Sequence, residues 1–381
     1  MAEKHQIIHG MLFQEEGSFS PGTLFLLDDR IVSEEIYHNT DGKETTTDAT
    51  GMYVIPGLTD IHFHGCMGQD CCDGTPEAFA TIAAYELLHG ITSFTPATMT
   101  MPEQVLAKIC QTARHFSCPD GADLCGLYME GPFINPAKKG AQNEAHIHPA
   151  DTGMLKRLQD ISGGCIRTVA IAPETEGAME FIQQNNGSVT LALAHTSADY
   201  DTAKKAFSLG ASQLTHAFNA MPPLSHRAPG PIGAAAEDTR CMAELICDGV
   251  HVHPSAVRAA FKLFGDDRII FISDSMRAAG MKDGTYDLGG QEVTVRGNLA
   301  VLADGTIAGS VTNLMDCMRT AVLHMDIPLA SAVKCAAVNP VKSIGLFQNY
   351  GSLAPGKYAN ILLLNSFLEL QTVFHRGKIL L

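Results

Sequence analysis

Eight short apolar runs, rich in residues that favour β-strands, recur between residues 53 and 272, and each is followed by a segment compatible with a helix. The runs occupy 53–61, 91–96, 126–129, 168–171, 189–194, 213–217, 242–246 and 269–272. This alternation is typical of a (β/α)₈ TIM barrel, in which helices surround eight parallel strands. A doubly wound open sheet is the alternative, and the lack of a glycine-rich phosphate loop at the early helices weakens it.

The two ends of the chain differ from its middle. Short β-like runs separated by turns occupy 6–13, 23–27 and 30–34 near one end, followed by a polar stretch at 39–48, and 356–365, 368–374 and 378–381 near the other. Two β segments that flank a long α/β region favour one small domain built from both termini. We therefore predict an α/β chain with a TIM barrel at 55–349 and a small β-sandwich domain formed by 1–54 and 350–381.

Composition restricts the partners and the compartment. The net charge of −15 repels polyanions, so nucleic acid is not expected as a partner. The first residues do not form a signal peptide, and no run reaches the roughly 18 apolar residues of a membrane span. The 11 cysteines are scattered and odd in number, which favours reduced thiols and a cytoplasmic location. Binding of a small anionic substrate remains compatible with this charge, provided that its site supplies local cations or backbone N–H groups.

Residues able to bind a metal occur at the ends of five of the predicted barrel strands. His62 and His64 close the first strand, and because alternate side chains share a face they project together. The other strand ends carry Glu130, His195, His216 and Asp274. In TIM-barrel enzymes the C-terminal ends of the strands form the active site. Imidazole and carboxylate ligands suit zinc or a similar divalent metal, with positions left open for water.

Each of these residues, taken alone, also has a structural interpretation. A single His at a strand end is more often structural or exposed, and Asp274 alone could cap a helix. The His-x-His spacing also occurs at His146/His148 and His251/His253, and only the pair after the first strand closes an apolar run. The metal site is therefore favoured by the order and placement of five strand ends together.

The segments around these positions resemble the amidohydrolase superfamily and, within it, the N-acetylglucosamine-6-phosphate deacetylases. The most specific stretches are 130–133 (EGPF), 138–140 (KKG), 216–221 (HAFNAM), 248–251 (DGVH) and 273–276 (SDSM). The resemblance extends from residues 54–60 to residues 356–360. It implies hydrolysis of the N-acetyl group of N-acetyl-D-glucosamine 6-phosphate to D-glucosamine 6-phosphate and acetate, in amino-sugar catabolism and recycling.

The same resemblance implies the metal ligands. Glu130, His195 and His216 bind the metal found throughout that family. Some members lack the histidines of the first strand and hold one metal, whereas this chain has both His62 and His64. The resemblance therefore allows a second metal, bridged by Glu130. One or two divalent ions per subunit are expected, zinc first, with iron, manganese or cobalt as alternatives.

Asp274 is the expected catalytic residue, and the resemblance also allows it to share the second metal. An amide is a poor electrophile with a poor leaving group, and a metal addresses the first difficulty by polarising the carbonyl. A carboxylate close to the attacking water addresses the second, because it can take a proton from the water and pass it to the departing nitrogen.

Substrate contacts are also implied by the resemblance. They involve Ala141, Gln142, Asn219, Ala220, His251, Ile307, Ala308 and Gly309. The phosphate is expected to meet Arg227 from a neighbouring subunit, which predicts a homodimer with shared sites. Gln142 stands where members of the family often carry His, and Gln can donate a hydrogen bond but cannot be a cation. Asn360 stands where the family usually has an acid.

Three alternatives stay open. The sequence does not separate the glucosamine from the galactosamine epimer, so an N-acetylgalactosamine-6-phosphate deacetylase is the first. A cyclic amidohydrolase of the dihydroorotase or hydantoinase type generally uses a carboxylated Lys at a strand end, where this chain has Glu130. A non-catalytic barrel relative commonly loses ligands, whereas here every predicted position is filled.

Overall fold

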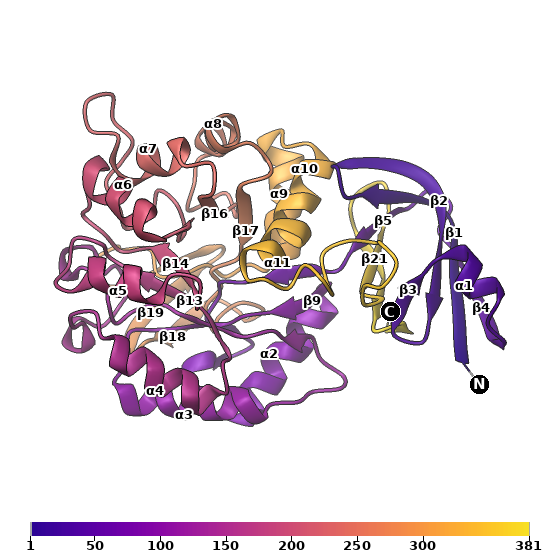
Figure 1. Cartoon of the computed structure of the whole chain (residues 1–381), viewed down its shortest axis with the longest axis horizontal. Coiled ribbons are helices and arrows are strands. Elements are labelled where there is room, and N and C mark those ends of the chain that lie inside the picture. The colour runs from indigo at the N-terminus through magenta and orange to yellow at the C-terminus, as the bar shows by residue number, and fades with distance from the viewer. Residues whose placement is uncertain (1, 381) are drawn as a thin grey trace.

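A parallel barrel forms the middle of the chain in the computed structural model, which describes residues 2–380 (Figure 1). Its strands are β6 (Leu58–Asp60), β9 (Ile91–Phe94) continued by β10 (Ala97–Thr98), β12 (Leu127–Met129), β13 (Ile166–Ile171), β14 (Thr190–Leu193), β15 (Gln213–Leu214), β16 (Met242–Ile246) and β17 (Ile269–Ile272). Neighbouring strands pair in parallel from β6 to β9 and from β10 to β17. The ring closes where Asp274 N donates to His62 O at 3.0 Å. The predicted (β/α)₈ barrel is confirmed.

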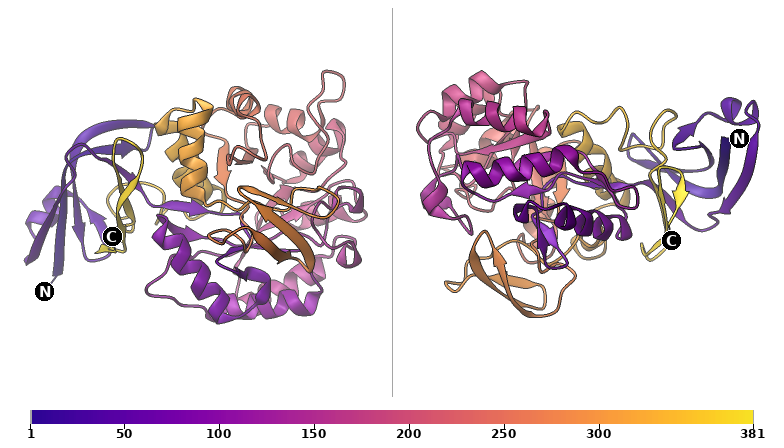
Figure 2. Two further views of the ribbon diagram at one scale, coloured as in Figure 1. Left: turned by 180° about the vertical axis from the view of Figure 1, so that it is seen from behind. Right: turned by 90° about the horizontal axis from the view of Figure 1, so that it is seen from below.

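Helices follow the barrel strands and cover the outside of the barrel (Figure 2). They are α2 (Pro76–Leu88), α3 (Glu103–His115), α4 (Thr152–Ser162), α5 (Ala178–Asn185), α6 (Tyr200–Leu209), α7 (Gly230–Glu237), α8 (Pro254–Phe264), α9 (Leu314–Met325), α10 (Leu329–Val333) and α11 (Asn339–Ser343). Side chains of Thr75, Asp151, Asp199 and Asn313 accept hydrogen bonds from backbone N–H groups at the starts of α2, α4, α6 and α9. Such caps satisfy donors that the helix itself leaves free. No helix in the described residues has the length and apolar character needed to cross a membrane.

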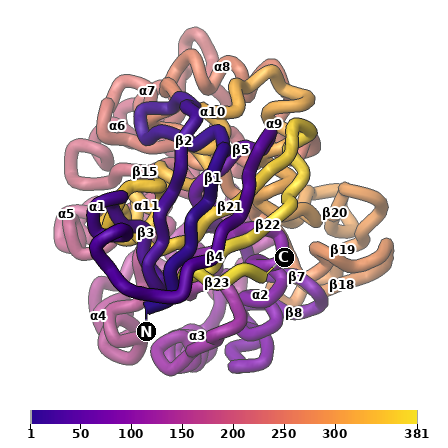
Figure 3. Tube along the Cα trace, turned by 90° about the vertical axis from the view of Figure 1, so that its right-hand side faces the viewer, coloured from indigo at the N-terminus to yellow at the C-terminus, as the bar shows by residue number. Residues whose placement is uncertain are grey.

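The two termini build one sheet at the end of the molecule (Figure 3). Its strands are β1 (Ala2–Gln14), β2 (Ser18–Leu27), β3 (Arg30–Val32), β4 (Gly42–Asp48), β5 (Tyr53–Pro56), β21 (Ile361–Leu364), β22 (Leu370–His375) and β23 (Lys378–Ile379), with the short helix α1 (Glu34–His38) after β3. Buried side chains from both termini, including Ile7, Leu26 and Phe374, form a core separate from that of the barrel. The predicted β domain of both termini is confirmed, as one continuous sheet.

The run 53–61, predicted as one barrel strand, is divided between the terminal sheet and the barrel. β5 pairs antiparallel with β21 of the terminal sheet, and the barrel begins only at β6. Gly57 lies between them, and a Cβ at this position would lie 2.2 Å from Thr92 Oγ1. The close approach to the neighbouring strand therefore requires Gly. β5 pairs with β21 as far as Pro56, so the terminal sheet extends beyond the predicted boundary at residue 54.

A small antiparallel sheet projects from the barrel between β17 and α9 (Figure 2). It consists of β18 (Gly284–Leu288), β19 (Gln291–Arg296) and β20 (Leu299–Val301). Leu288 and Val293 pack with Met99 and Met276 of the barrel loops. Gln291 Nε2 donates to the carbonyl of Ala141, so this sheet is attached to the loop after β12. It forms one wall above the open end of the barrel.

Candidate metal centre and substrate cavity

Six buried side chains converge at the C-terminal ends of the barrel strands. They form two groups, and within each group three potential ligand atoms lie within 4.8 Å of one another. The first group is His62, His64 and Asp274, and the second is Glu130, His195 and His216. All six sequence-predicted ligand positions are therefore brought together.

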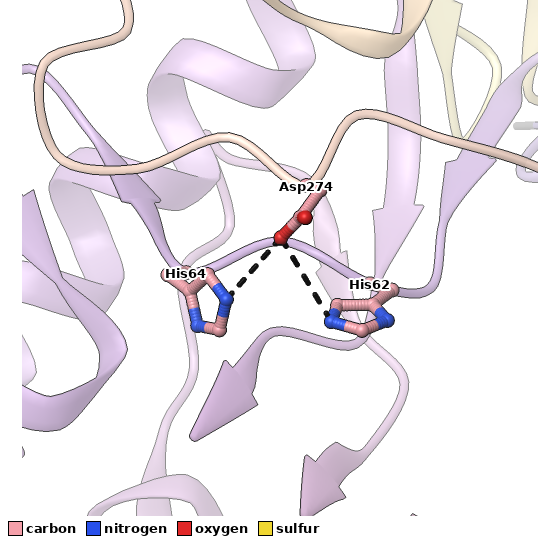
Figure 4. A group of neighbouring side chains, drawn as sticks. All are labelled: His62, His64 and Asp274. Carbon is pink, nitrogen blue, oxygen red and sulfur yellow. Dashed lines mark ion pairs between the residues drawn. The ribbon is translucent and has the colours of Figure 1, made fainter. Parts of the chain in front are cut away.

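Asp274 lies between the two histidines of the first group (Figure 4). Its Oδ1 is 3.3 Å from His64 Nε2 and 3.9 Å from His62 Nε2. Glu130 approaches the same two rings, with Oε1 3.4 Å from His62 Nε2 and Oε2 3.4 Å from His64 Nε2. Glu130 thus occupies the position of a ligand shared by both groups.

The second group is more tightly drawn together. Glu130 Oε1 lies 3.1 Å from His195 Nε2 and 3.0 Å from His216 Nε2. The two Nε2 atoms are 3.2 Å apart. Two imidazole nitrogens facing each other at this distance need a proton or a cation between them.

Hydrogen bonds at the far side of three rings fix where their protons lie. The Nδ1 atoms of His62, His64 and His195 meet Glu244 Oε2 at 2.9 Å, Ala97 O at 3.2 Å and Lys138 O at 2.8 Å. Because these oxygens accept, Nδ1 of each ring carries a proton. When Nε2 is deprotonated, as metal binding requires, its lone pair points into the centre.

His62 Nε2 is buried and has no hydrogen-bond partner among residues 2–380. A buried nitrogen lone pair beside three other imidazoles and two carboxylates is the donor set that zinc and similar divalent metals take. The residues present therefore fit a divalent metal, at one or at two positions.

Both carboxylates of the centre are held ionised by their surroundings. Burial alone would raise the pKa of Glu130, but the charge on His62 and hydrogen bonds from His195 and His216 hold that pKa well below its usual range. Burial also opposes ionisation of Asp274, yet its hydrogen bond with His64 and the neighbouring histidine charges lower its pKa. Asp274 is thus a carboxylate able to accept a proton at neutral pH.

Three of the six residues have a backbone conformation that is rare outside glycine. The φ angles are +42° at His195, +30° at His216 and +48° at Asp274, and Ala220 follows with +51°. Such left-handed conformations cost about 1–3 kcal/mol each and are typical of functional sites. The turn directly after each barrel strand aims these side chains into the mouth of the barrel.

A cavity of about 390 Å³ lies above the metal centre. Its walls include the predicted substrate residues Ala141, Gln142, Asn219, Ala220, His251, Ile307 and Gly309. Ala308 is fully buried and does not line the cavity. Arg227 lies in the exposed loop between β15 and α7, outside the lining of this subunit's cavity. The substrate roles of all these residues stay predictions.

Two cavity residues have defined partners. His251 Nδ1 lies 2.7 Å from Asp248 Oδ2, and although burial opposes the charged ring, this contact raises the pKa of His251. Gln142 donates from Nε2 to Glu130 Oε2 at 2.7 Å and accepts from Thr100 N at 2.6 Å. Gln142 therefore supports Glu130 directly as well as lining the cavity.

Two buried acids of the site, Glu244 and Asp60, are not among the residues predicted from the sequence. Glu244 of β16 contacts His62, and Asp60 of β6 accepts from His62 N and Ser273 N at 3.2 Å each. For Glu244 the available signal was an acid inside an otherwise apolar strand, whereas Asp60 ends β6 directly after the polar Thr59. The contacts made by the carbonyls of Ala97 and Lys138 had no such signal, because every residue has a backbone carbonyl.

Comparison with known proteins agrees with this geometry. Residues 53–380 match the Amidohydrolase family. The chain is 36% identical to the N-acetylglucosamine-6-phosphate deacetylase of Bacillus subtilis, covering 86% of this chain and 84% of that protein. It is 34% identical to an N-acetylgalactosamine-6-phosphate deacetylase of Escherichia coli O157:H7, covering 88% and 89%. A Mycobacterium smegmatis N-acetyl-D-glucosamine-6-phosphate deacetylase mutant, solved in complex with N-acetyl-D-glucosamine-6-phosphate, superposes with a TM-score of 0.87 at 32% identity, covering 100% and 98% of the two chains.

Proposed function

This chain belongs to the amidohydrolase family, and on that premise we propose that it hydrolyses N-acetyl-D-glucosamine 6-phosphate to D-glucosamine 6-phosphate and acetate. The observation that carries this proposal is the convergence of four imidazoles and two carboxylates beneath a cavity at the barrel mouth. The names of the relatives support the phosphosugar as substrate. The E. coli relative keeps the galactosamine epimer as a second candidate substrate.

The other two alternatives find less support. Neither ligand group in the described residues contains a lysine, which a cyclic amidohydrolase with a carboxylated Lys would place there. A barrel without catalysis would have no reason to keep all six ligand side chains buried and aimed at one centre. All 11 cysteines are unpaired, which suits a reducing compartment, so a cytoplasmic location belongs to the proposal.

The metal centre would hold one or two divalent ions, with zinc favoured over iron, manganese and cobalt. Glu130, His195 and His216 would bind one ion, and His62 and His64 with the shared Glu130 would bind a second. When bound, such an ion polarises the acetyl carbonyl and makes water a stronger acid.

Asp274 performs the proton transfers in this proposal. Its carboxylate lines the cavity and has a lowered pKa, and its backbone is held by the hydrogen bond from Asp274 N to His62 O. It takes a proton from the attacking water as the water adds to the amide carbon. It then gives that proton to the sugar nitrogen as the carbon–nitrogen bond breaks, so the amine leaves neutral.

The cavity walls would orient the sugar phosphate. His251, whose pKa is raised by its contact with Asp248, offers an imidazole N–H to the phosphate. Asn219, Ile307 and Gly309 border the same space. A cation is needed for a phosphate dianion in a chain of net charge −15, because the overall field gives no attraction.

Arg227 of a neighbouring subunit is proposed as that cation, in a homodimer with shared sites. Its guanidinium can donate two hydrogen bonds to a phosphate at once. Arg227→Ala is expected to raise KM for the phosphorylated substrate roughly ten- to a thousand-fold, because charge-assisted hydrogen bonds are lost. Steady-state kinetics on phosphorylated and unphosphorylated N-acetyl sugars measure this effect.

Hydrolysis of the unphosphorylated sugar serves as the control, since it should be slow and unchanged by the substitution. Equal effects on both sugars would remove Arg227 from phosphate recognition. Sedimentation at assay concentration tests the dimer, and a fully active monomer would rule out shared sites.

A further inference from the structure

Glu244 has no part in the chemistry proposed above, yet its carboxylate is fully buried in the middle of β16. It accepts three hydrogen bonds. His62 Nδ1 and His216 N donate to Oε2 at 2.9 and 3.1 Å, and Gln213 Nε2 donates to Oε1 at 2.5 Å. A buried carboxylate is costly unless its oxygens are satisfied, and here three donors satisfy them.

The contact with His62 sets the direction of that ring. With Nδ1 bound to Glu244, Nε2 is the ring atom that faces the centre, 3.4 Å from Glu130 Oε1. Tyr128 packs against the ring face, with ring centroids 4.4 Å apart. His64 and His195 have their Nδ1 atoms on neutral carbonyls, so His62 alone of these three is supported by a carboxylate.

The contact with His216 is made to its backbone. His216 has φ of +30°, a conformation that needs support from its surroundings. The bond from His216 N to Glu244 Oε2 provides it, and Ala217 N donates to the carbonyl of Glu244 at 2.8 Å. One residue of β16 thus contacts a ligand of each group.

We propose that Glu244 is a positioning residue that fixes His62 and His216, one histidine of each ligand group, relative to each other. Its effect on metal affinity should be larger at the group that contains His62. The inference rests on the metal-dependent function proposed above. Residues that orient metal-binding histidines typically contribute 10- to 100-fold to metal affinity, and a carboxylate also makes the ring a stronger donor.

Glu244→Leu and Glu244→Gln test this inference by metal affinity. Competition of Zn²⁺ between the protein and a chromogenic chelator, without substrate, gives the affinity of each ion, and visible absorption of the Co²⁺-loaded protein reports the ligand geometry. Glu244→Leu is expected to lower the affinity for one ion about 10- to 100-fold and the affinity for the other ion by less.

Glu244→Gln should cause a smaller loss than the Leu variant. Its amide oxygen can still accept from His62 and His216, and its NH₂ can face Gln213, whose Oε1 has no partner among the described residues. The amide therefore keeps the geometry and loses only the charge. If the Leu variant does not fold, a measurable loss in the Gln variant alone carries the test.

Asn339→Ala is the matched control. Asn339 is a buried polar residue of the same barrel that donates to Asp266 O and Ile269 O at 2.7 Å each, and it belongs to neither ligand group. It should lower Tm and leave metal affinity unchanged.

Wild-type affinity and absorption in both Glu244 variants would overturn the proposal, as would an equal loss of affinity in the Asn339 control. Because no sugar is present, these results stay readable even if no sugar phosphate proves to be a substrate.

Discussion

Asp274→Asn is expected to lower kcat at least about 100-fold, the range in which general acid–base groups contribute, while KM changes little. Asn has nearly the same shape but cannot carry the proton from water to nitrogen. It also tolerates the φ of +48° at this position and keeps the backbone bond to His62 O. Steady-state kinetics with a coupled acetate assay measure the effect.

Asp160→Asn provides the comparison, because Asp160 is an exposed residue of α4 that is not part of the cavity lining. It should retain wild-type kcat. Metal content of the Asp274 variant must be measured alongside, so that loss of an ion is not mistaken for loss of the proton carrier. More than a few per cent of wild-type turnover in a metal-loaded Asp274→Asn enzyme would remove Asp274 from the proton-transfer role.

Substitutions of the histidines are expected to fall into two tiers. His195→Ala or His216→Ala should abolish activity and empty the main site, since these rings lie 3.0–3.1 Å from the shared Glu130 Oε1. His62→Ala or His64→Ala should lower the metal content toward one ion per subunit and leave partial activity, because both rings lie farther from Glu130, at 3.4 Å.

Elemental analysis of the four dialysed variants gives the number of ions per subunit, which is compared with the kcat of each variant. His115 is exposed in the last turn of α3, and the His115→Ala variant should match the wild type in metal content and in kcat. If all four site variants lost every ion equally, the two groups would not be separable sites.

The barrel could be predicted because its strands are buried, so each appears in the sequence as an apolar run. The strand β4 lacks that signal: its residues are polar and mostly exposed, and it is held beside β1 by backbone pairing. The division of 53–61 between two sheets also had no signal, because β5 and β6 are both buried and follow each other directly.

The metal ligands could be predicted because parallel barrel strands all end at the same mouth, which brings distant residues such as His62 and Asp274 together. The supports behind them could not be placed in the same way. Gln142 contacts Glu130 from a loop in which it also accepts a hydrogen bond from Thr100 N. In the sheet β18–β20, Leu288 lines the cavity and Gln291 donates to the carbonyl of Ala141, which lines it too. These contacts depend on loop conformation, which periodicity does not encode.

Acetate release by the purified enzyme, measured with metal content on one preparation, tests the central claim most directly. The substrates are N-acetylglucosamine 6-phosphate and N-acetylgalactosamine 6-phosphate, assayed before chelation, after chelation and after restoring Zn²⁺. We expect one or two divalent ions per subunit, stoichiometric acetate from N-acetylglucosamine 6-phosphate at the higher kcat/KM, loss of activity with the metal, and its return with Zn²⁺. Full activity in the metal-free protein, or no acetate from either sugar phosphate with the metal sites filled, would contradict the account.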